Sequence, residues 1–376
     1  MSHDVAIVGA GIVGLAHALA AVKRGLKTIV IDRDASPSGA SIRNFGFITV
    51  TGQRRGETWG RALRSAAIWA EVAPRAGIAI EQRGLLVLAR RPEAVAVLEA
   101  FAATEMGEQC ELLSGDAAQG RLAGVQPASL GAALWSPHEV RVESREAIPR
   151  LVDWLASLGV EFRFRCAALA IDDAGVETSR GRIRAGRVIA CPGDDLSTLY
   201  PETYDRLGVT RCVLQMMRLE SPGHRLPAPL MTDLSLVRYR GYADLPQAGD
   251  LLARLRTEQA SHLEHGVHLI VTQGQDGSLI VGDSHHYADS PGPFAASEVE
   301  RLILDELRET LGATPHIRER WTGTYASAEA DMFRAAPADH VRHVVVTSGT
   351  GASTAFAIAE ETLEDLFGPH PGDALP

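Results

Sequence analysis

Residues 4–14 read DVAIVGAGIVG, an apolar run that leads directly into the pattern GxGxxG. The run predicts a strand that is buried on both faces of a parallel sheet. In this pattern Gly9 makes a tight turn, Gly11 lets the backbone approach a pyrophosphate, and Gly14 lets the following helix pack closely on the strand.

The residues that follow complete a β-α-β unit. Apolar side chains recur at helical spacing over residues 12–24, and residues 28–31 form a second apolar run. Asp32 comes next, where a carboxylate can accept a hydrogen bond from a ribose hydroxyl. The unit therefore predicts a bound dinucleotide, with its phosphates at the N-terminus of the helix.

Composition narrows the class of partner. The chain has 376 residues, of which 45% are hydrophobic and 22% charged, and a formal net charge of -10. These values are typical of a globular protein of about two domains. The negative charge argues against nucleic acid and anionic membranes as partners, so a small-molecule substrate is favoured.

Several further expectations come from what the sequence lacks. It has no basic n-region followed by an apolar segment and no run of about 18 apolar residues, so we expect a cytoplasmic protein with no membrane partner. The four cysteines are far apart and lack metal-ligand spacing, so no metal site is expected. Nothing in the sequence indicates the oligomeric state.

The rest of the chain predicts an α/β protein with two kinds of sheet. Helices are predicted at residues 57–73, 92–106, 145–158, 297–311 and 353–367. Strands that return to the first sheet are predicted at 160–165, 169–172, 187–191 and 343–347, and another strand at 84–89. Extended runs at 212–219, 236–240, 267–272 and 278–281 predict a second, mostly antiparallel layer, and the charged stretch 248–266 a surface helix or lid.

Three segments beyond the first unit carry a family resemblance. Residues 38–46 (SGASIRNFG), 188–194 (VIACPGD) and 344–351 (VVVTSGTG) occur in the order of the FAD-contacting segments of the D-amino-acid oxidase, glycine oxidase and sarcosine oxidase family. The chain resembles that family over its whole length. The resemblance implies an FAD-dependent oxidoreductase.

It also implies a domain organisation. An FAD-binding Rossmann-like domain of the glutathione-reductase type would comprise residues 1–80, 140–208 and 327–376. A second, α+β substrate domain, built on a mostly antiparallel sheet, would comprise residues 81–139 and 209–326.

The resemblance carries over to the residues that would hold the FAD. They are Gly9, Gly11, Ile12, Val13, Gly14, Asp32, Arg33, Ala40, Ser41, Arg43, Asn44, Phe45, Gly46, Ala168, Cys191, Pro192, Gly193, Gly349, Thr350, Gly351, Ala352, Ser353 and Thr354. Relatives that bind flavin covalently use a cysteine after a Trp-x-Gly strand or a histidine in the N-terminal loop. Residues 327–334 contain no cysteine and residues 41–46 no histidine, which implies non-covalent FAD.

The departures from the family bear on the substrate. Relatives that oxidise amino acids place a carboxylate-binding arginine just after the Trp-x-Gly strand, where this chain has Thr324 and Tyr325. Relatives with a lysine that assists oxygen place it in a strand similar to 278–282, which has none here. Without this lysine the sequence leaves two possibilities for the electron acceptor, oxygen or another acceptor. The stretch Arg-Asn-Phe-Gly, followed by Gly-Gln at 52–53, resembles amine oxidases linked to breakdown of 2-aminoethylphosphonate.

Candidate side chains for binding and catalysis follow from these comparisons. His285 and His286, after the 278–281 strand, are candidate bases, because an amine must lose its ammonium proton before hydride can leave the adjacent carbon. Tyr325 is the third catalytic candidate. The candidates for holding an anionic substrate are Arg43, Thr49, Gln53, Arg238, Arg240 and Thr324.

The sequence thus predicts oxidation of a small amine with an anionic group, most simply 2-aminoethylphosphonate or its N-methyl derivative. Hydride would pass to flavin N5, and the imine would hydrolyse to an aldehyde, phosphonoacetaldehyde. Two alternatives remain open at this point. One is an oxidase of the glycine, sarcosine or D-amino-acid type, and the other is an FAD-binding protein without turnover.

Overall fold

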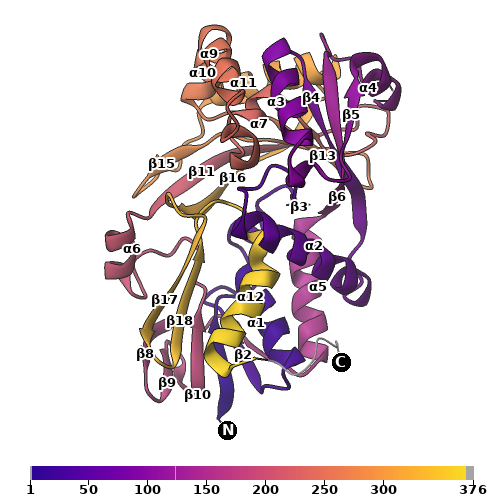
Figure 1. Cartoon of the computed structure of the whole chain (residues 1–376). Helices are drawn as coiled ribbons and strands as arrows, with labels where there is room; N and C mark the ends of the chain where they lie inside the picture. The colour runs from indigo at the N-terminus through magenta and orange to yellow at the C-terminus, as the bar shows by residue number, and fades with distance from the viewer. Residues whose placement is uncertain (1, 123, 370–376) are drawn as a thin grey trace.

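A computed structural model describes residues 2–122 and 124–369. The chain forms two sheets that lie one above the other in Figure 1, each with its own helices. The lower half contains the parallel sheet with α1 (Ile12–Lys23), α12 (Gly351–Phe367) and α5 (Ser144–Ser157). The upper half contains the second sheet, with α9 (Ala248–Glu258) and α11 (Ser297–Leu311) near its top. An α/β fold with a second, mostly antiparallel sheet is confirmed.

The first sheet is built around the predicted β-α-β unit. Its strand order is β17-β18-β10-β1-β2-β7, and β18, β10, β1, β2 and β7 run parallel. Their bounds are β1 His3–Val8, β2 Thr28–Ile31, β7 Glu161–Arg163, β10 Gly181–Ala190, β17 Met332–Ala338 and β18 Val341–Val346, with β8 Ala168–Asp172 and β9 Gly175–Thr178 branching from β10. The strands β1, β10 and β18 lie side by side although they are far apart in the sequence, since β10 pairs with β1 on one side and with β18 on the other. On its other side β1 pairs with β2.

Helices cover the parallel sheet with apolar faces. In α1 the side chains of Leu15, Ala18 and Leu19 are buried, and they join one core with Phe356 and Ile358 of α12. The helix α2 (Glu57–Arg75) packs beside α12, where the rings of Trp69 and Phe356 meet edge to face at 5.2 Å. This packing fixes the N-termini of α1 and α12 relative to each other.

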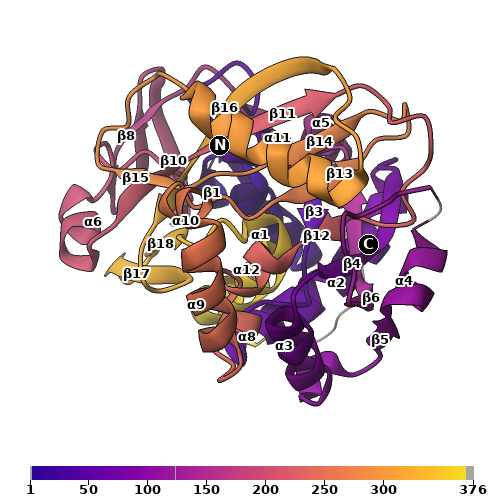
Figure 2. The same cartoon turned by 90° about the horizontal axis from the view of Figure 1, so that it is seen from above.

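The second sheet runs in the order β15-β11-β14-β13-β12-β4-β6-β3, with β16 paired to β11 and β5 to β6. Its strands are β3 Phe47–Ile48, β4 Ile80–Ala89, β5 Glu111–Ser114, β6 Ala132–Val142, β11 Thr210–Leu219, β12 Leu230–Met231, β13 Ile270–Gln273, β14 Leu279–Gly282, β15 His286–Ala288 and β16 Ile317–Ser327. All of its pairings are antiparallel except β12 with β4. Seen from above, α11 lies across β13 and β14 (Figure 2).

The remaining helices are short or lie at the surface. They are η1 Ala40–Ile42, α3 Pro92–Ala102, η2 Glu105–Gly107, α4 Gly115–Arg121, α6 Pro201–Leu207, α7 Asp233–Leu236, α8 Arg240–Ala243 and α10 Ala260–Glu264. The charged stretch predicted as a surface helix forms α9 and α10. No helix of the described residues is long and apolar enough to span a membrane.

One predicted strand is wrong. Residues 236–240 do not extend but link α7 to α8. The side chains of Leu234 and Leu236 are both buried, while Asp233 accepts hydrogen bonds from the backbone amide of Arg90 and the guanidinium of Arg91. The side chains of residues 233–236 are all buried, which does not fit the alternation expected of a strand.

Candidate active site

A cavity of about 610 Å³ lies between the two sheets. At one end it is lined by the residues that follow β1, β2 and β10, including Gly9, Asp32 and Cys191. At the other it is lined by residues of the second sheet, including His285 and Tyr325. Ligands of open α/β sheets bind beyond the carboxyl ends of the strands, which is where the first end of this cavity lies.

The glycine-rich turn leaves backbone exposed where side chains cannot fit. A Cβ on Gly9, whose φ is +102°, would lie 2.2 Å from the carbonyl oxygen of Cys191, and a Cβ on Gly14 would lie 1.8 Å from the carbonyl oxygen of Gly9. The backbone amide of Ile12 donates to the hydroxyl of Ser41 at 2.9 Å. The turn and the loop after β2 therefore form one wall at the N-terminus of α1.

Asp32 is fixed beside this turn. Its carboxylate accepts hydrogen bonds from the backbone amides of Ala10 at 2.7 Å and Asp34 at 2.9 Å. Partial burial raises the pKa of Asp32, and these two amides oppose that effect. The carboxylate is held at the edge of the cavity, in the position expected for a ribose hydroxyl contact.

A second helix N-terminus faces the same cavity. Residues 349–353 line it at the start of α12, next to residues 11–14 at the start of α1. The hydroxyl of Ser353 accepts from the backbone amide of Thr49 at 2.8 Å, and Gln53 donates to the hydroxyl of Thr49 at 2.6 Å. Two helix N-termini direct their positive partial charge to one space, which suits a ligand with phosphates.

Most of the predicted cofactor residues meet at this cavity. Two of them do not line it. Gly46 approaches β6 instead, since a Cβ there would lie 1.8 Å from the carbonyl oxygen of Val142. Thr354 donates its hydroxyl to the carbonyl of Thr350, one turn back in α12. The predicted residues that do line the cavity are Gly9, Gly11, Ile12, Val13, Gly14, Asp32, Arg33, Ala40, Ser41, Arg43, Asn44, Phe45, Ala168, Cys191, Pro192, Gly193, Gly349, Thr350, Gly351, Ala352 and Ser353.

The thiol of Cys191 is inert in this setting. Burial raises its pKa, and its sulfur lies 3.7 Å from Nδ1 of His17. A thiol that stays protonated is a poor nucleophile. Cys191 is therefore a poor candidate for a covalent link to a cofactor.

The predicted substrate residues also line the cavity, but their charges are compensated differently. The guanidinium of Arg240 pairs with Asp244 at 2.7 Å. Half-buried Arg238 donates one hydrogen bond, to the hydroxyl of Tyr287 at 3.0 Å, and forms no ion pair with a carboxylate of the described chain. Exposed Arg43 forms no such pair there either. The other three predicted residues at the cavity are Thr49, Gln53 and Thr324.

Of the three catalytic candidates, two line the cavity and one does not. His285 is buried and lines the cavity, and its ring lies edge to face with that of Tyr325 at 6.5 Å. Burial, and next the charge of Arg238, hold the pKa of His285 well below its ordinary value. The adjacent His286 does not line the cavity, and its Nε2 lies 3.0 Å from Nδ1 of His265. The structure therefore brings only His285 and Tyr325 to the cavity.

Among the cavity residues that were not candidates from the sequence, three polar side chains lie beside His285 or Arg238. They are His268, Asp283 and Tyr287. Asp283 and Tyr287 flank the histidine pair in the sequence, and His268 precedes β13, the hairpin partner of β14. A prediction that the runs 267–272 and 278–281 pair as an antiparallel hairpin would have placed His268 near Asp283. The structure shows this pairing, in which Ile270 lies opposite Gly282.

Comparisons with known proteins agree with this geometry. A sequence model of the family described as "DAO: FAD dependent oxidoreductase" matches residues 4–364. No curated protein sequence matches the chain.

Solved structures of similar fold cover nearly the whole chain. Glycine oxidase from Geobacillus kaustophilus is 15% identical with a TM-score of 0.77, covering 97% of this chain and 94% of its own. L-proline dehydrogenase from P. horikoshii is 18% identical with a TM-score of 0.78, covering 96% and 92%. L-alpha-glycerophosphate oxidase from Mycoplasma pneumoniae, solved with FAD bound, is 15% identical with a TM-score of 0.75, covering 97% and 95%.

Proposed function

The chain belongs to the DAO family of FAD-dependent oxidoreductases, and on this premise we propose that it oxidises a small amine that carries an anionic group. One observation carries the proposal. The guanidinium of Arg238 lines the cavity, half-buried, with a phenol hydroxyl as its one hydrogen-bond partner. A guanidinium has five N–H donors, of which the Tyr287 hydroxyl accepts from one, so this group suits the anionic end of a substrate.

The charge of the cavity favours a phosphonate as that anionic end. Arg43 is a second cavity arginine without a carboxylate partner in the described chain, whereas Arg54 lies 3.6 Å from Asp331 and Arg240 is paired. A phosphonate carries up to two charges and three acceptor oxygens, which two arginines and nearby hydroxyls can satisfy. We propose 2-aminoethylphosphonate or its N-methyl derivative as substrate.

Different groups of the protein would bind the cofactor and orient the substrate. The N-termini of α1 and α12, with Ser41 and Asp32, would hold the dinucleotide, and Arg238 would orient the substrate by its anionic end. FAD, when bound, supplies a hydride acceptor for the carbon next to nitrogen. The resulting imine would hydrolyse to an aldehyde and an amine. The names of two proteins of similar fold, glycine oxidase and L-proline dehydrogenase, are consistent with oxidation at a carbon–nitrogen bond.

Steady-state assays test the substrate class. The holoenzyme is supplied in turn with 2-aminoethylphosphonate, its N-methyl form, glycine and sarcosine, and turnover is followed by peroxide release and by dye reduction. The two readouts also separate oxygen from another electron acceptor. We expect the highest kcat/KM with one of the two phosphonates.

A substitution ties the substrate class to the residue. Arg238→Met should raise KM for a phosphonate roughly 10-fold to 100-fold, the value of about 1.5–3 kcal/mol for a charged hydrogen bond. The exposed Arg301, which pairs with Asp305, provides the control Arg301→Met. Equal KM values for the two variants would show that Arg238 does not hold the anion.

An oxidase of the glycine or sarcosine type is the second candidate. The arrangement of Arg238 with the Tyr287 hydroxyl also suits a carboxylate, in place of the arginine that the 324–325 position lacks. A higher kcat/KM for glycine or sarcosine than for either phosphonate would favour this candidate.

A further inference from the structure

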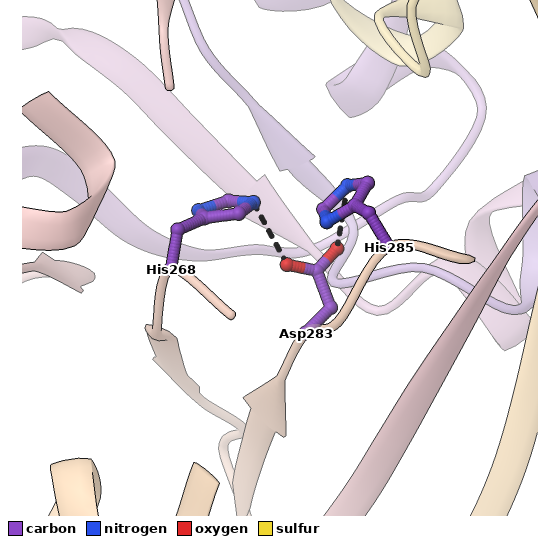
Figure 3. A group of neighbouring side chains, drawn as sticks. All are labelled: His268, Asp283 and His285. Atoms are coloured by element: carbon purple, nitrogen blue, oxygen red, sulfur yellow. Dashed lines mark ion pairs between the residues drawn. The ribbon is translucent and has the colours of Figure 1, made fainter. Parts of the chain in front are cut away.

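Three buried side chains form a cluster inside the cavity. His268, Asp283 and His285 come from neighbouring segments of one hairpin, and Figure 3 shows both imidazoles directed at the carboxylate of Asp283. Nε2 of His268 lies 2.9 Å from one carboxylate oxygen, and Nε2 of His285 lies 3.8 Å from the other.

The hydrogen bonds of His285 fix where its proton lies. Nδ1 of His285 is 2.9 Å from the carbonyl oxygen of Gly266, and a carbonyl only accepts, so Nδ1 must donate. In a neutral imidazole Nε2 then has a lone pair and no proton. This lone pair faces Oδ2 of Asp283, a second acceptor. Two acceptors therefore lie side by side with no proton between them.

The charged and titratable groups around His285 keep this arrangement near neutral pH. They come from several segments and are Asp283, His268, Arg238, Tyr325 and Tyr287. Burial favours the neutral form of His285, whose pKa is well below its usual value. Burial also opposes the charge of Asp283, but the adjacent His268 and the charge of Arg238 act in the opposite direction, and the pKa of Asp283 is lowered to about 2.

We propose that Asp283 and His285 form the site that binds the ammonium group of the substrate and removes its proton, with His268 as a positioning residue. This inference rests on the proposed function and adds how the amine is recognised. An ammonium group has the positive charge and the N–H donors that a carboxylate and an adjacent imidazole lone pair require. His268 donates to Asp283 and holds the carboxylate in place.

The proton balance is simple. One N–H bond of the ammonium breaks, an Nε2–H bond forms on His285, and the electron pair stays on the substrate nitrogen. The imidazolium that results is stabilised by the adjacent Asp283 carboxylate. The freed lone pair on nitrogen is what hydride departure from the next carbon requires.

The location of Arg238 makes the cavity complementary to a zwitterion. Its positive charge is close enough to affect the pKa of both His285 and Asp283. A substrate with an ammonium at Asp283 and an anionic group at Arg238 would satisfy both charges. The same positive charge opposes a divalent metal ion at the three side chains.

The test compares ligands with and without an amine on the holoenzyme. Anaerobic rapid mixing gives the apparent Kd of 2-aminoethylphosphonate from the concentration dependence of flavin bleaching. Ethylphosphonate, which lacks the amine, is measured as a competitor of that bleaching. Asp283→Asn should weaken the amine ligand at least 10-fold and change ethylphosphonate binding less than about 2-fold. His316→Gln, at an exposed histidine, is the control.

A pH profile separates a proton acceptor from a structural residue. In His285→Gln the bleaching rate should rise with pH up to the pKa of a free amine, near about 10, because only pre-deprotonated substrate reacts. The wild-type rate should level off at lower pH. His268→Gln, which keeps a donor to Asp283, should bind the amine ligand more tightly than His268→Leu. If Asp283→Asn does not retain FAD, the His285→Gln profile decides.

Three outcomes would overturn the inference. Equal weakening of both ligands by Asp283→Asn, or parallel pH profiles of wild type and His285→Gln, would overturn it while leaving the proposed function intact. One equivalent of zinc or iron in the wild-type holoenzyme, lost in His268→Leu, would assign the cluster to a metal instead. Wild-type flavin that no amine bleaches would overturn the proposed function, and this inference with it.

Discussion

The carbonyl oxygen of Cys191 occupies the space beside Gly9, 2.2 Å from where a Cβ on residue 9 would lie. This contact joins the turn after β1 to the end of β10, so neither segment can move away without opening the parallel sheet. The turn therefore tolerates no side chain.

Gly9→Ala should abolish FAD binding, because both the contact with Cys191 and the positive φ exclude a side chain. The measurement is flavin content after purification, together with thermal unfolding. Gly39→Ala is the matched control, since Gly39 also lines the cavity but a Cβ there meets nothing within 4 Å. Full flavin content in Gly9→Ala would contradict the assignment of this turn.

Tyr287→Phe should raise KM for the substrate about 2-fold to 10-fold with little change in kcat, the effect of losing one hydrogen bond of about 0.5–1.5 kcal/mol. The reason is that the Tyr287 hydroxyl accepts from the guanidinium of Arg238 and helps to orient it. Steady-state kinetics measures both constants, and Tyr200→Phe, outside the cavity, serves as control. A fall in kcat without a change in KM would assign Tyr287 to the chemistry instead.

Stability should fall in mild acid. Burial lowers the pKa of His17 from 6.5 to about 4, although its bond to the carbonyl of Val13 opposes this effect. Because the pKa of His17 is lower in the folded state, its neutral imidazole contributes its full stabilisation of the fold above pH 6.5. This stabilisation is lost as pH falls towards 4. The loss should reach about 3 kcal/mol at pH 4.

Chemical denaturation of wild type and His17→Gln at pH 7.5 and 4.5 measures the loss from His17. The variant should lose less stability between the two pH values, whatever its stability at pH 7.5. His316→Gln, at an exposed position, should lose as much as wild type. Identical losses in wild type and His17→Gln would contradict a buried neutral imidazole.

Asp233→Ala should cost about 1.5–3 kcal/mol of unfolding free energy, because it leaves the buried backbone amide of Arg90 without its acceptor and removes one of the two carboxylates that pair with Arg91, the other being Glu258. The carboxylate of Asp233 is fully buried and accepts from the backbone amide of Arg90 at 2.9 Å and from Nη1 of Arg91 at 2.6 Å. Denaturant unfolding measures the cost. Glu146→Ala, which removes an exposed i,i+4 pair with Arg150, should cost less than about 1 kcal/mol. Similar costs for the two would refute the argument from burial.

The cofactor end of the site was predictable because its signals are local. Gly9, Gly14 and Asp32 belong to one continuous β-α-β unit, whose spacing alone predicts a turn, a helix N-terminus and an acidic contact. The later segments, such as residues 349–351, became recognisable by their resemblance to a family. The two exceptions, Gly46 and Thr354, are explained by contacts with β6 and within α12 that the sequence does not reveal.

The substrate end was less predictable because it depends on register. Successive side chains of an extended segment point in opposite directions, so of the two candidates His285 and His286 only one can face the cavity. The sequence does not say which, because that depends on how β14 pairs with β13 and β11. The same pairing brings His268 next to Asp283 from a position distant in the sequence. Arg238 was selected on a predicted strand that is in fact a helical link.

The pairing of α1 with α12 at the cavity has a consequence for synthesis of the protein. The first helix N-terminus begins at residue 12 and the second at residue 351, and both line the space for the dinucleotide. A nascent chain still on the ribosome has only the first of them until α12 has also been translated. FAD can therefore be captured in its complete site only after translation of α12, and a chain truncated before that helix is expected to remain without flavin.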